Sequence, residues 1–315
     1  MEYILLIVGL VLIIVGAMML TDGSVALANR LRVPEFVVGL TVVAVGTSMP
    51  ELVVSLISAL KGSGEMAIGN VVGSNAFNVY AILGICAMFA PIAFTKSNIR
   101  RDIPICILAS VALLAATALN NDITRWEGII LLLGYVAMVY FTVRADRRKM
   151  VAGASQTSES EGAKPIVMPA WRMFIWIVGG LGMLIYGGQL CVDSATEIAH
   201  NLGVSEATIA ITLVAGGTSL PELAAGLVSL IKGRASLALG NVLGSNIANI
   251  LLILGSCSLI TPLQMGNVTM VDIAIVVSAA FMVLLSALFI GRDKMTRFEG
   301  AIFLACYVAY VYTLV

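Results

Sequence analysis

Long apolar stretches separated by short polar breaks run along the whole chain. Ten of them are long enough to cross a bilayer, because an α-helix rises about 1.5 Å per residue and the hydrocarbon core is about 30 Å thick. They lie at residues 2–28, 34–60, 66–92, 102–119, 125–144, 171–199, 204–230, 236–261, 271–290 and 296–315. The pattern predicts an all-α membrane protein of ten transmembrane helices, five on each side of one polar segment.

Composition supports the membrane class. Of the 315 residues 60% are apolar and 11% are charged, whereas soluble domains are roughly 45–50% apolar and about 25% charged. The first stretch lacks the basic start of a signal peptide, so we interpret it as a helix. The five cysteines form no CxxC or CxxH pair, which indicates small core residues. Net charge is zero without a basic patch, so nucleic acid is not an expected partner.

The two halves of the chain are related copies. A shift of 171 residues aligns 46–84 with 217–255, with 21 of 39 positions identical, and a shift of 172 aligns TRWEG at 124–128 with TRFEG at 296–300. We therefore expect one five-helix repeat at 1–145 and a second at 171–315. The segment between them, 146–170, contains QTSESEGAKP and is predicted to be a solvated polar linker.

An odd number of helices per repeat predicts that the repeats are inverted. Lys and Arg concentrate in cytoplasmic loops, and an external N-terminus puts 16 of the 18 basic residues inside. The exceptions are Lys61 and Arg125. We expect a multi-pass protein of the cell (inner) membrane with both termini outside and a cytoplasmic linker. Inverted repeats with interrupted helices are typical of secondary transporters, whose binding site lies at the midplane.

The motif GTSMPEL at 46–52 recurs as GTSLPEL at 217–223. Proline has no N–H to donate to the preceding turn, so Pro50 and Pro221 should leave carbonyl oxygens free in an apolar setting. Glutamate follows each proline and shares a helix face with the hydroxyls three and four residues before it. Each copy is therefore a cluster of oxygen ligands around one carboxylate. A protonated glutamate, or one hydrogen-bonded to a neighbouring helix, is the alternative interpretation.

A second repeated motif, GSNAFN at 73–78 and GSNIAN at 244–249, combines a glycine with polar side chains one turn apart. Ser74 and Asn78 share a helix face, as do Ser245 and Asn249, and we favour an ion-lining role for these pairs. For Asn70, Asn75, Asn241 and Asn246, packing between helices is a competing interpretation. Oxygen ligands without thiolate or imidazole suit Ca²⁺ or Na⁺, and two carboxylates neutralise one Ca²⁺.

With these residues in both halves, the chain resembles the calcium/cation antiporter superfamily, and most closely its compact prokaryotic sodium/calcium exchangers. The resemblance implies that broken second, third, seventh and eighth helices form the site while the first and sixth slide across it. It implies Glu51 and Glu222 as calcium ligands, joined by the carbonyls of Thr47 and Thr218. The sodium sites that it implies draw on Ala44, Ser48, Ser74, Ala215, Ser219 and Ser245, with Asn78 and Asn249 nearby. Glycines at 9, 16, 23, 180 and 187 would give the sliding helices a smooth face, or simply pack tightly.

One residue departs from the resemblance. Many sodium-coupled members carry an acid where this chain has Asn249, and proton-coupled relatives often have an amide there. The expected function is Na⁺/Ca²⁺ antiport by alternating access, with Ca²⁺/H⁺ antiport on the same two glutamates as the alternative.

Two further classes are less favoured. An ion channel does not explain the inverted duplication, and an intramembrane enzyme lacks GxGD, HExxH and GxSxG motifs. We thus expect no enzyme activity and no cofactor. The expected partners are Ca²⁺ and Na⁺ as transported ions, with membrane lipid around a chain that can work as a monomer.

Overall fold

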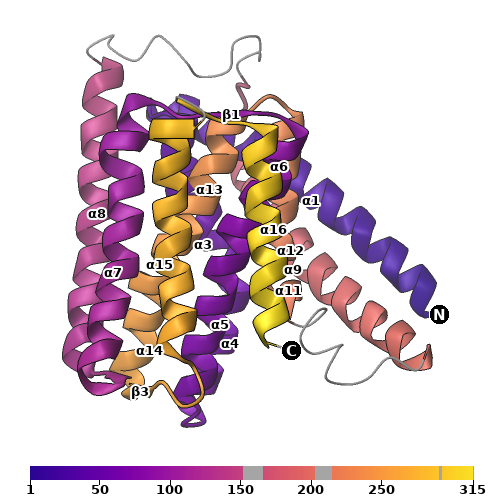
Figure 1. Cartoon of the computed structure of the whole chain (residues 1–315). Coiled ribbons are helices and arrows are strands. Elements are labelled where there is room, and N and C mark those ends of the chain that lie inside the picture. The colour runs from indigo at the N-terminus through magenta and orange to yellow at the C-terminus, as the bar shows by residue number, and fades with distance from the viewer. Residues whose placement is uncertain (152–165, 203–214, 291–292, 315) are drawn as a thin grey trace.

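The computed structural model describes residues 1–151, 166–202, 215–290 and 293–314. These residues form helices and four strands of two residues each. Both chain termini lie toward one end of the helix bundle, and strand β1 lies at the other (Figure 1).

The helices of the first half follow its apolar stretches, with π-helical segments (η) inside several of them. In chain order the elements are α1 Glu2–Leu31, α2 Glu35–Val38, η1 Gly39–Val43, α3 Ala44–Thr47, α4 Met49–Leu60, α5 Gly64–Ala76, η2 Phe77–Leu83, α6 Gly84–Phe89, β1 Ile92–Ala93, η3 Asn98–Asp102, α7 Ile103–Asn120, β2 Asp122–Ile123 and α8 Arg125–Val151.

The described part of the second half follows a similar order, except that η6 follows α15 whereas η3 precedes α7. Its elements are α9 Ala170–Asn201, α11 Ala215–Gly217, α12 Leu220–Ile231, α13 Ala235–Ala248, η5 Asn249–Leu254, α14 Gly255–Ile260, β3 Leu263–Gln264, α15 Met270–Leu285, η6 Ser286–Ile290, β4 Lys294–Met295 and α16 Arg297–Leu314. The start of the predicted span 204–230 lies outside the described residues.

By length and apolar composition, seven helices of the described chain could cross a membrane. An eighth span is obtained if Glu35–Thr47 and Met49–Leu60 are joined across their 48° bend. The all-helical membrane fold is thus confirmed, while the total of ten spans stays a prediction. Ser48 separates the two bent parts, and Pro50 lies in the first turn of α4. Backbone N–H groups in the first turn have no partner within the helix, so the missing N–H of proline costs no hydrogen bond there.

The centre of the bundle is formed by α5–α6 and α13–α14. In their most apolar stretches 78% and 94% of the residues are buried, against 28–44% for the other spanning helices. Glycine permits this close packing: a Cβ added to Gly240 would lie 2.4 Å from the carbonyl oxygen of Phe36, and one added to Gly39 would lie 2.5 Å from that of Leu237. Helix α13 therefore lies directly against the backbone of α2 and η1.

Helices α1 and α9 pack against each other through glycines. A Cβ at Gly16 would meet the oxygen of Gly180 at 2.7 Å, and one at Gly9 would meet that of Gly187 at 2.9 Å. The pairing order shows that the helices are antiparallel. The N-terminal part of α1 and the C-terminal part of α9 project from the bundle together, at the lower right of Figure 1. These glycines serve tight packing between α1 and α9, which agrees with the second of the two interpretations above.

Two small antiparallel sheets connect the halves of the chain. Strand β1 pairs with β4 through Ile92 and Met295, and β2 pairs with β3 through Ile123 and Leu263. The 171-residue shift relates β1 to β3, and these lie at opposite ends of the bundle (Figure 1). Equivalent strands of the two halves thus occupy opposite ends.

Candidate functional site

The two glutamates of the repeated motif are buried at the centre of the bundle, each held by a serine from the other half. Ser48 donates to Glu222 Oε1 at 2.9 Å, and Ser219 donates to Glu51 Oε1 at 3.1 Å. Both glutamates have no exposed surface. The bend before α4 and the start of α12 place each serine just before a helix, so that its hydroxyl reaches across to the opposite carboxylate.

The second oxygen of each carboxylate has no protein partner. Glu51 Oε2 and Glu222 Oε2 are both buried and make no hydrogen bond to any described residue. A buried polar atom without a partner is costly, and more so when it carries charge. These two oxygens are therefore available to a ligand.

The GSN motifs extend the cluster on one side of Glu51. Ser74 Oγ lies 3.3 Å from Glu51 Oε1 and 3.2 Å from Ser219 Oγ. Asn249 donates from Nδ2 to Ser74 Oγ at 3.1 Å. Asn249 Oδ1 and both polar atoms of Asn78 are buried without a partner among the described residues. The two glutamates and these two asparagines thus hold four buried oxygen atoms with unused acceptor capacity, one on each side chain.

Ser245 and Thr47 are also fully buried, and both donate to backbone carbonyl oxygens. Ser245 donates to the carbonyl oxygen of Ala44 at 3.4 Å, and Thr47 donates to the carbonyl oxygen of Val43 at 3.1 Å. Thr218 is half-buried beside the cluster. Ala215 begins α11, and its side chain lies outside what the structure describes.

The four asparagines whose role was left open hold the site helices together. Asn70 Nδ2 donates to the carbonyl oxygen of Glu51 at 3.2 Å, and Asn241 Nδ2 donates to that of Glu222 at 3.4 Å. Asn75 and Asn246 donate to each other's carbonyl oxygens at 3.2 and 3.1 Å. Each pair spans equivalent contacts in the two halves, which is how helix-packing polar residues are expected to act.

One residue of the site was missed from the sequence. Ser55 is buried one turn after Glu51, and its hydroxyl accepts from Asn70 Nδ2 at 3.0 Å. Its spacing of four residues from the glutamate is the signal that could have identified it.

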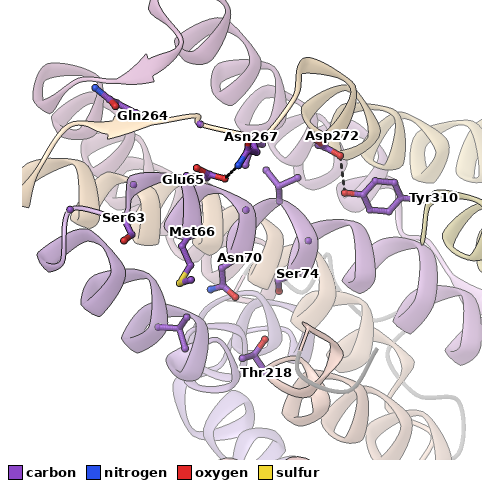
Figure 2. A pocket seen from close by; sticks show the side chains of 18 residues that line it. Ser63, Glu65, Met66, Asn70, Ser74, Thr218, Gln264, Asn267, Asp272 and Tyr310 are labelled. Carbon is purple, nitrogen blue, oxygen red and sulfur yellow. Dashed lines mark hydrogen bonds between the residues drawn. The ribbon is translucent and has the colours of Figure 1, made fainter. Parts of the chain in front are cut away.

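An open pocket of about 1020 Å³ leads from the surface to Ser74 and Thr218. Figure 2 shows Glu65, Asn267, Asp272 and Tyr310 in the upper part of the view, with the buried Ser74 and then Thr218 below them. Glu65 accepts from Asn267 at 2.8 Å, and Tyr310 donates to Asp272 at 3.2 Å. The pocket opens at the end of the bundle where β3 and both termini lie (Figure 1).

The chemistry of the cluster suits a hard cation. Within the described residues no three His, Cys, Asp or Glu side chains lie close enough to hold a metal ion by themselves. The ligand set on offer is instead two carboxylates supplemented by hydroxyl and amide oxygens, which is the kind that Ca²⁺ and Na⁺ accept. All five cysteines are free, and four of them are buried, as expected for core residues.

Comparisons with known proteins agree on one family. The model of the sodium/calcium exchanger protein family matches residues 1–144 and 172–315. The chain is 37% identical to a putative antiporter, CaxA, of Alkalimonas amylolytica, over 99% of this chain and 98% of that protein. It is 30% identical to the sodium/calcium exchanger MaX1 of Methanosarcina acetivorans, over 99% and 98%. The solved structure of the sodium-calcium exchanger NCX_Mj soaked with zero Na⁺ and Ca²⁺ superimposes with a TM-score of 0.85 and 30% identity, covering 100% of this chain and 99% of that one.

Proposed function

Because the chain belongs to the sodium/calcium exchanger protein family, we propose that it exchanges Na⁺ for Ca²⁺ across the cell membrane by alternating access to one central site. The family and the fold support a cation and calcium antiporter. The name of the relative MaX1 supports sodium as the coupling ion.

The observation that carries the proposal is the pair of buried carboxylates with one unpartnered oxygen each. A bare carboxylate at the centre of a membrane helix costs about 2.5–3.5 kcal/mol on insertion scales. Two such groups in one cluster need a positive charge, and one Ca²⁺ supplies it in full. Na⁺ ions bound to the same oxygens supply it in turn, so the two cations exclude each other and their movements are coupled.

In this proposal Glu51 and Glu222 are the central calcium ligands, with the carbonyls of Thr47 and Thr218 completing the shell. Sodium ions use the oxygens of Ser48, Ser74, Ser219 and Ser245, with the backbone at Ala44 and Ala215 and the amides of Asn78 and Asn249 nearby. Ten spanning helices in two inverted repeats, with both termini outside, make the pocket beside Ser74 an external entrance.

A gradient-swap flux measurement tests the coupling ion. Everted membrane vesicles that contain the chain are loaded with NaCl and diluted into sodium-free buffer with labelled calcium. We expect rapid calcium uptake that an imposed pH gradient in the absence of sodium does not reproduce. Vesicles with Glu51→Gln or Glu222→Gln serve as controls and should show no exchange. Uptake driven by the pH gradient alone would overturn the sodium assignment.

The second candidate function is Ca²⁺/H⁺ antiport, which the amide at position 249 favours. Asn249 adds no negative charge to the site, and its Nδ2 group is occupied by Ser74 Oγ and by Asn75 Oδ1 at 3.0 Å. A site with two carboxylates can be neutralised by two protons as well as by one Ca²⁺. The pH-driven arm of the same flux measurement identifies this function.

A further inference from the structure

An ion pair connects the end of α12 to α1. Lys232 Nζ lies 2.7 Å from Asp22 Oδ1 and donates to the carbonyl oxygen of Met18 at 3.1 Å. Beside this ion pair, the hydroxyls of Thr21 and Ser229 are hydrogen-bonded at 3.1 Å. Helix α1 is therefore docked on α12 by polar contacts at the end of the bundle opposite the pocket.

The repeat places the same two residue types at the equivalent positions of the other half. The shift of 171 residues aligns Asp22 with Asp193, on α9, and it aligns Lys61, at the end of α4, with Lys232. Asp193 and Lys61 are both exposed. Within the residues that the structure describes, no ion pair joins them. The Asp22–Lys232 ion pair is thus formed, while the equivalent residues Asp193 and Lys61 are not paired with each other.

The helix faces beside these two residue pairs also differ in burial: the face on α12 is covered, and the equivalent face on α4 is exposed. Ala225 on α12 is 1% exposed and belongs to the apolar cluster that contains α1 residues. Its equivalent on α4, Val54, is 37% exposed and lines the pocket. Helix α1 packs along α12, whereas α9 has no comparable contact with α4.

We infer that the two ion pairs are alternating latches of the transport cycle: Asp22–Lys232 closes the state described here, and Asp193–Lys61 closes the opposite-facing state. This inference rests on the proposed alternating access. In an inverted repeat, the opposite-facing state arises when the two halves exchange their conformations. Since glycines hold α1 and α9 together, a movement that lifts α1 from α12 brings α9 toward α4 and buries Val54.

The closed latch is strong enough to bias the equilibrium and weak enough to open. The side chains of Lys232 and Asp22 are 24% and 31% exposed, so their attraction is partly screened by solvent. For an ion pair of this kind we expect a shift of roughly two- to fivefold in the ratio of the two states when one charge is removed.

Cross-linking in membranes tests the inference. One variant carries Asp22→Cys and Lys232→Cys, and its mirror carries Lys61→Cys and Asp193→Cys. A bifunctional thiol reagent with a short spacer is used, because a disulfide requires Cα atoms within about 7 Å. A protease site in the linker at 156–165 then separates the two halves on a gel unless a cross-link joins them. The unsubstituted chain reports any background from its native cysteines.

Both variants should cross-link, because the chain visits both states. Adding Asp22→Asn to the mirror variant should raise its cross-linking rate roughly two- to fivefold. Adding Glu2→Gln, which removes a carboxylate in the first turn of α1 and outside both latches, should leave the rate unchanged. The inference is overturned if the mirror variant does not cross-link under conditions that link the first, or if Asp22→Asn leaves its rate unaltered.

The measurement needs no ion gradient, so its outcome is separate from that of the flux assay. Coupled cross-linking without Na⁺/Ca²⁺ exchange would refute the proposed ions and retain the latches. Exchange with uncoupled cross-linking would refute the latches alone.

Discussion

Replacing Glu51 by glutamine removes one charge from the site with little change of shape. The carboxylate Oε1 accepts from Ser219 at 3.1 Å and from Ser74 at 3.3 Å, and a glutamine carbonyl can accept the same two bonds. The amide NH₂ then takes the place of the unpartnered Oε2. The variant therefore presents a hydrogen-bond donor at the position where a cation needs an acceptor.

The expected loss of calcium affinity follows from the charge. Two unit charges about 4 Å apart attract by about 4 kcal/mol at an effective dielectric constant near 20, and a divalent ion doubles this to about 8 kcal/mol. Roughly half of this is offset, because water and the remaining oxygen ligands still coordinate the ion in the variant. A net loss of about 4 kcal/mol corresponds to a roughly thousandfold weaker Kd.

Calcium-dependent thermal unfolding of the purified protein in detergent measures this loss. For the unsubstituted chain, calcium at about 100 times Kd should add about 2.7 kcal/mol to the free energy of unfolding. The same calcium concentration should add nothing measurable to Glu51→Gln, while the stability of the ion-free variant should not fall. The control is Glu65→Gln, whose half-buried carboxylate at the pocket mouth is bonded to Asn267, and its Kd should stay within about twofold. A Glu51→Gln variant that keeps its calcium Kd within tenfold would refute the site.

Three further variants test the surroundings of the site. Gly180→Ala puts a Cβ 2.7 Å from a backbone nitrogen of α1 and should lower the free energy of unfolding by about 1–3 kcal/mol. The control Gly182→Ala, which has open space around its Cβ, should not lower it. Thermal unfolding of the two variants measures the difference. Asn249→Asp loses the two hydrogen bonds that the amide donates, and the new carboxyl group can donate one of them only when it is protonated. The transport rate of this variant should therefore fall as pH rises. An unchanged pH profile would argue that these two hydrogen bonds do not support transport. Ser48→Ala removes the donor to Glu222, which is worth about 1.5–3 kcal/mol, so the calcium KM should rise at least about tenfold and Ser48→Thr should restore it.

The helices and the central cluster could be predicted because each has a strong local signal. Apolar length determines where a helix can span, and most of the described helices begin and end within a few residues of the predicted stretches, although α8 continues to Val151, beyond the predicted end at 144. The repeated motifs indicated that Glu51 and Glu222 would meet, since two copies of one unit form equivalent contacts around a common axis. The reciprocal bonds from Ser48 and Ser219 follow the same logic.

Other features depend on contacts between segments far apart in the chain. The glycines at 16 and 180 could equally serve sliding or packing, and the 2.7 Å approach of their backbones decided between these. Glu65 and Asp272 lie around the pocket because the α4–α5 turn comes close to the segment after β3. Nothing in the spacing of these acids along the chain indicates that approach.

Two ion pairs of the described residues differ in burial, and therefore in strength. One joins α2 to α13, and the other joins α1 to α12. Arg234 and Glu35 form an ion pair between the start of α13 and that of α2, with side chains only 6% and 8% exposed. Removing one partner of such a buried pair costs about 3–5 kcal/mol, whereas an exposed pair contributes about 0–1 kcal/mol. The polar contacts of α1 with α12 include the partly exposed pair of Lys232 and Asp22. The weaker contacts therefore lie between α1 and the core, while α2 and α13 stay together, so that the helices around the carboxylates can keep their geometry as access changes.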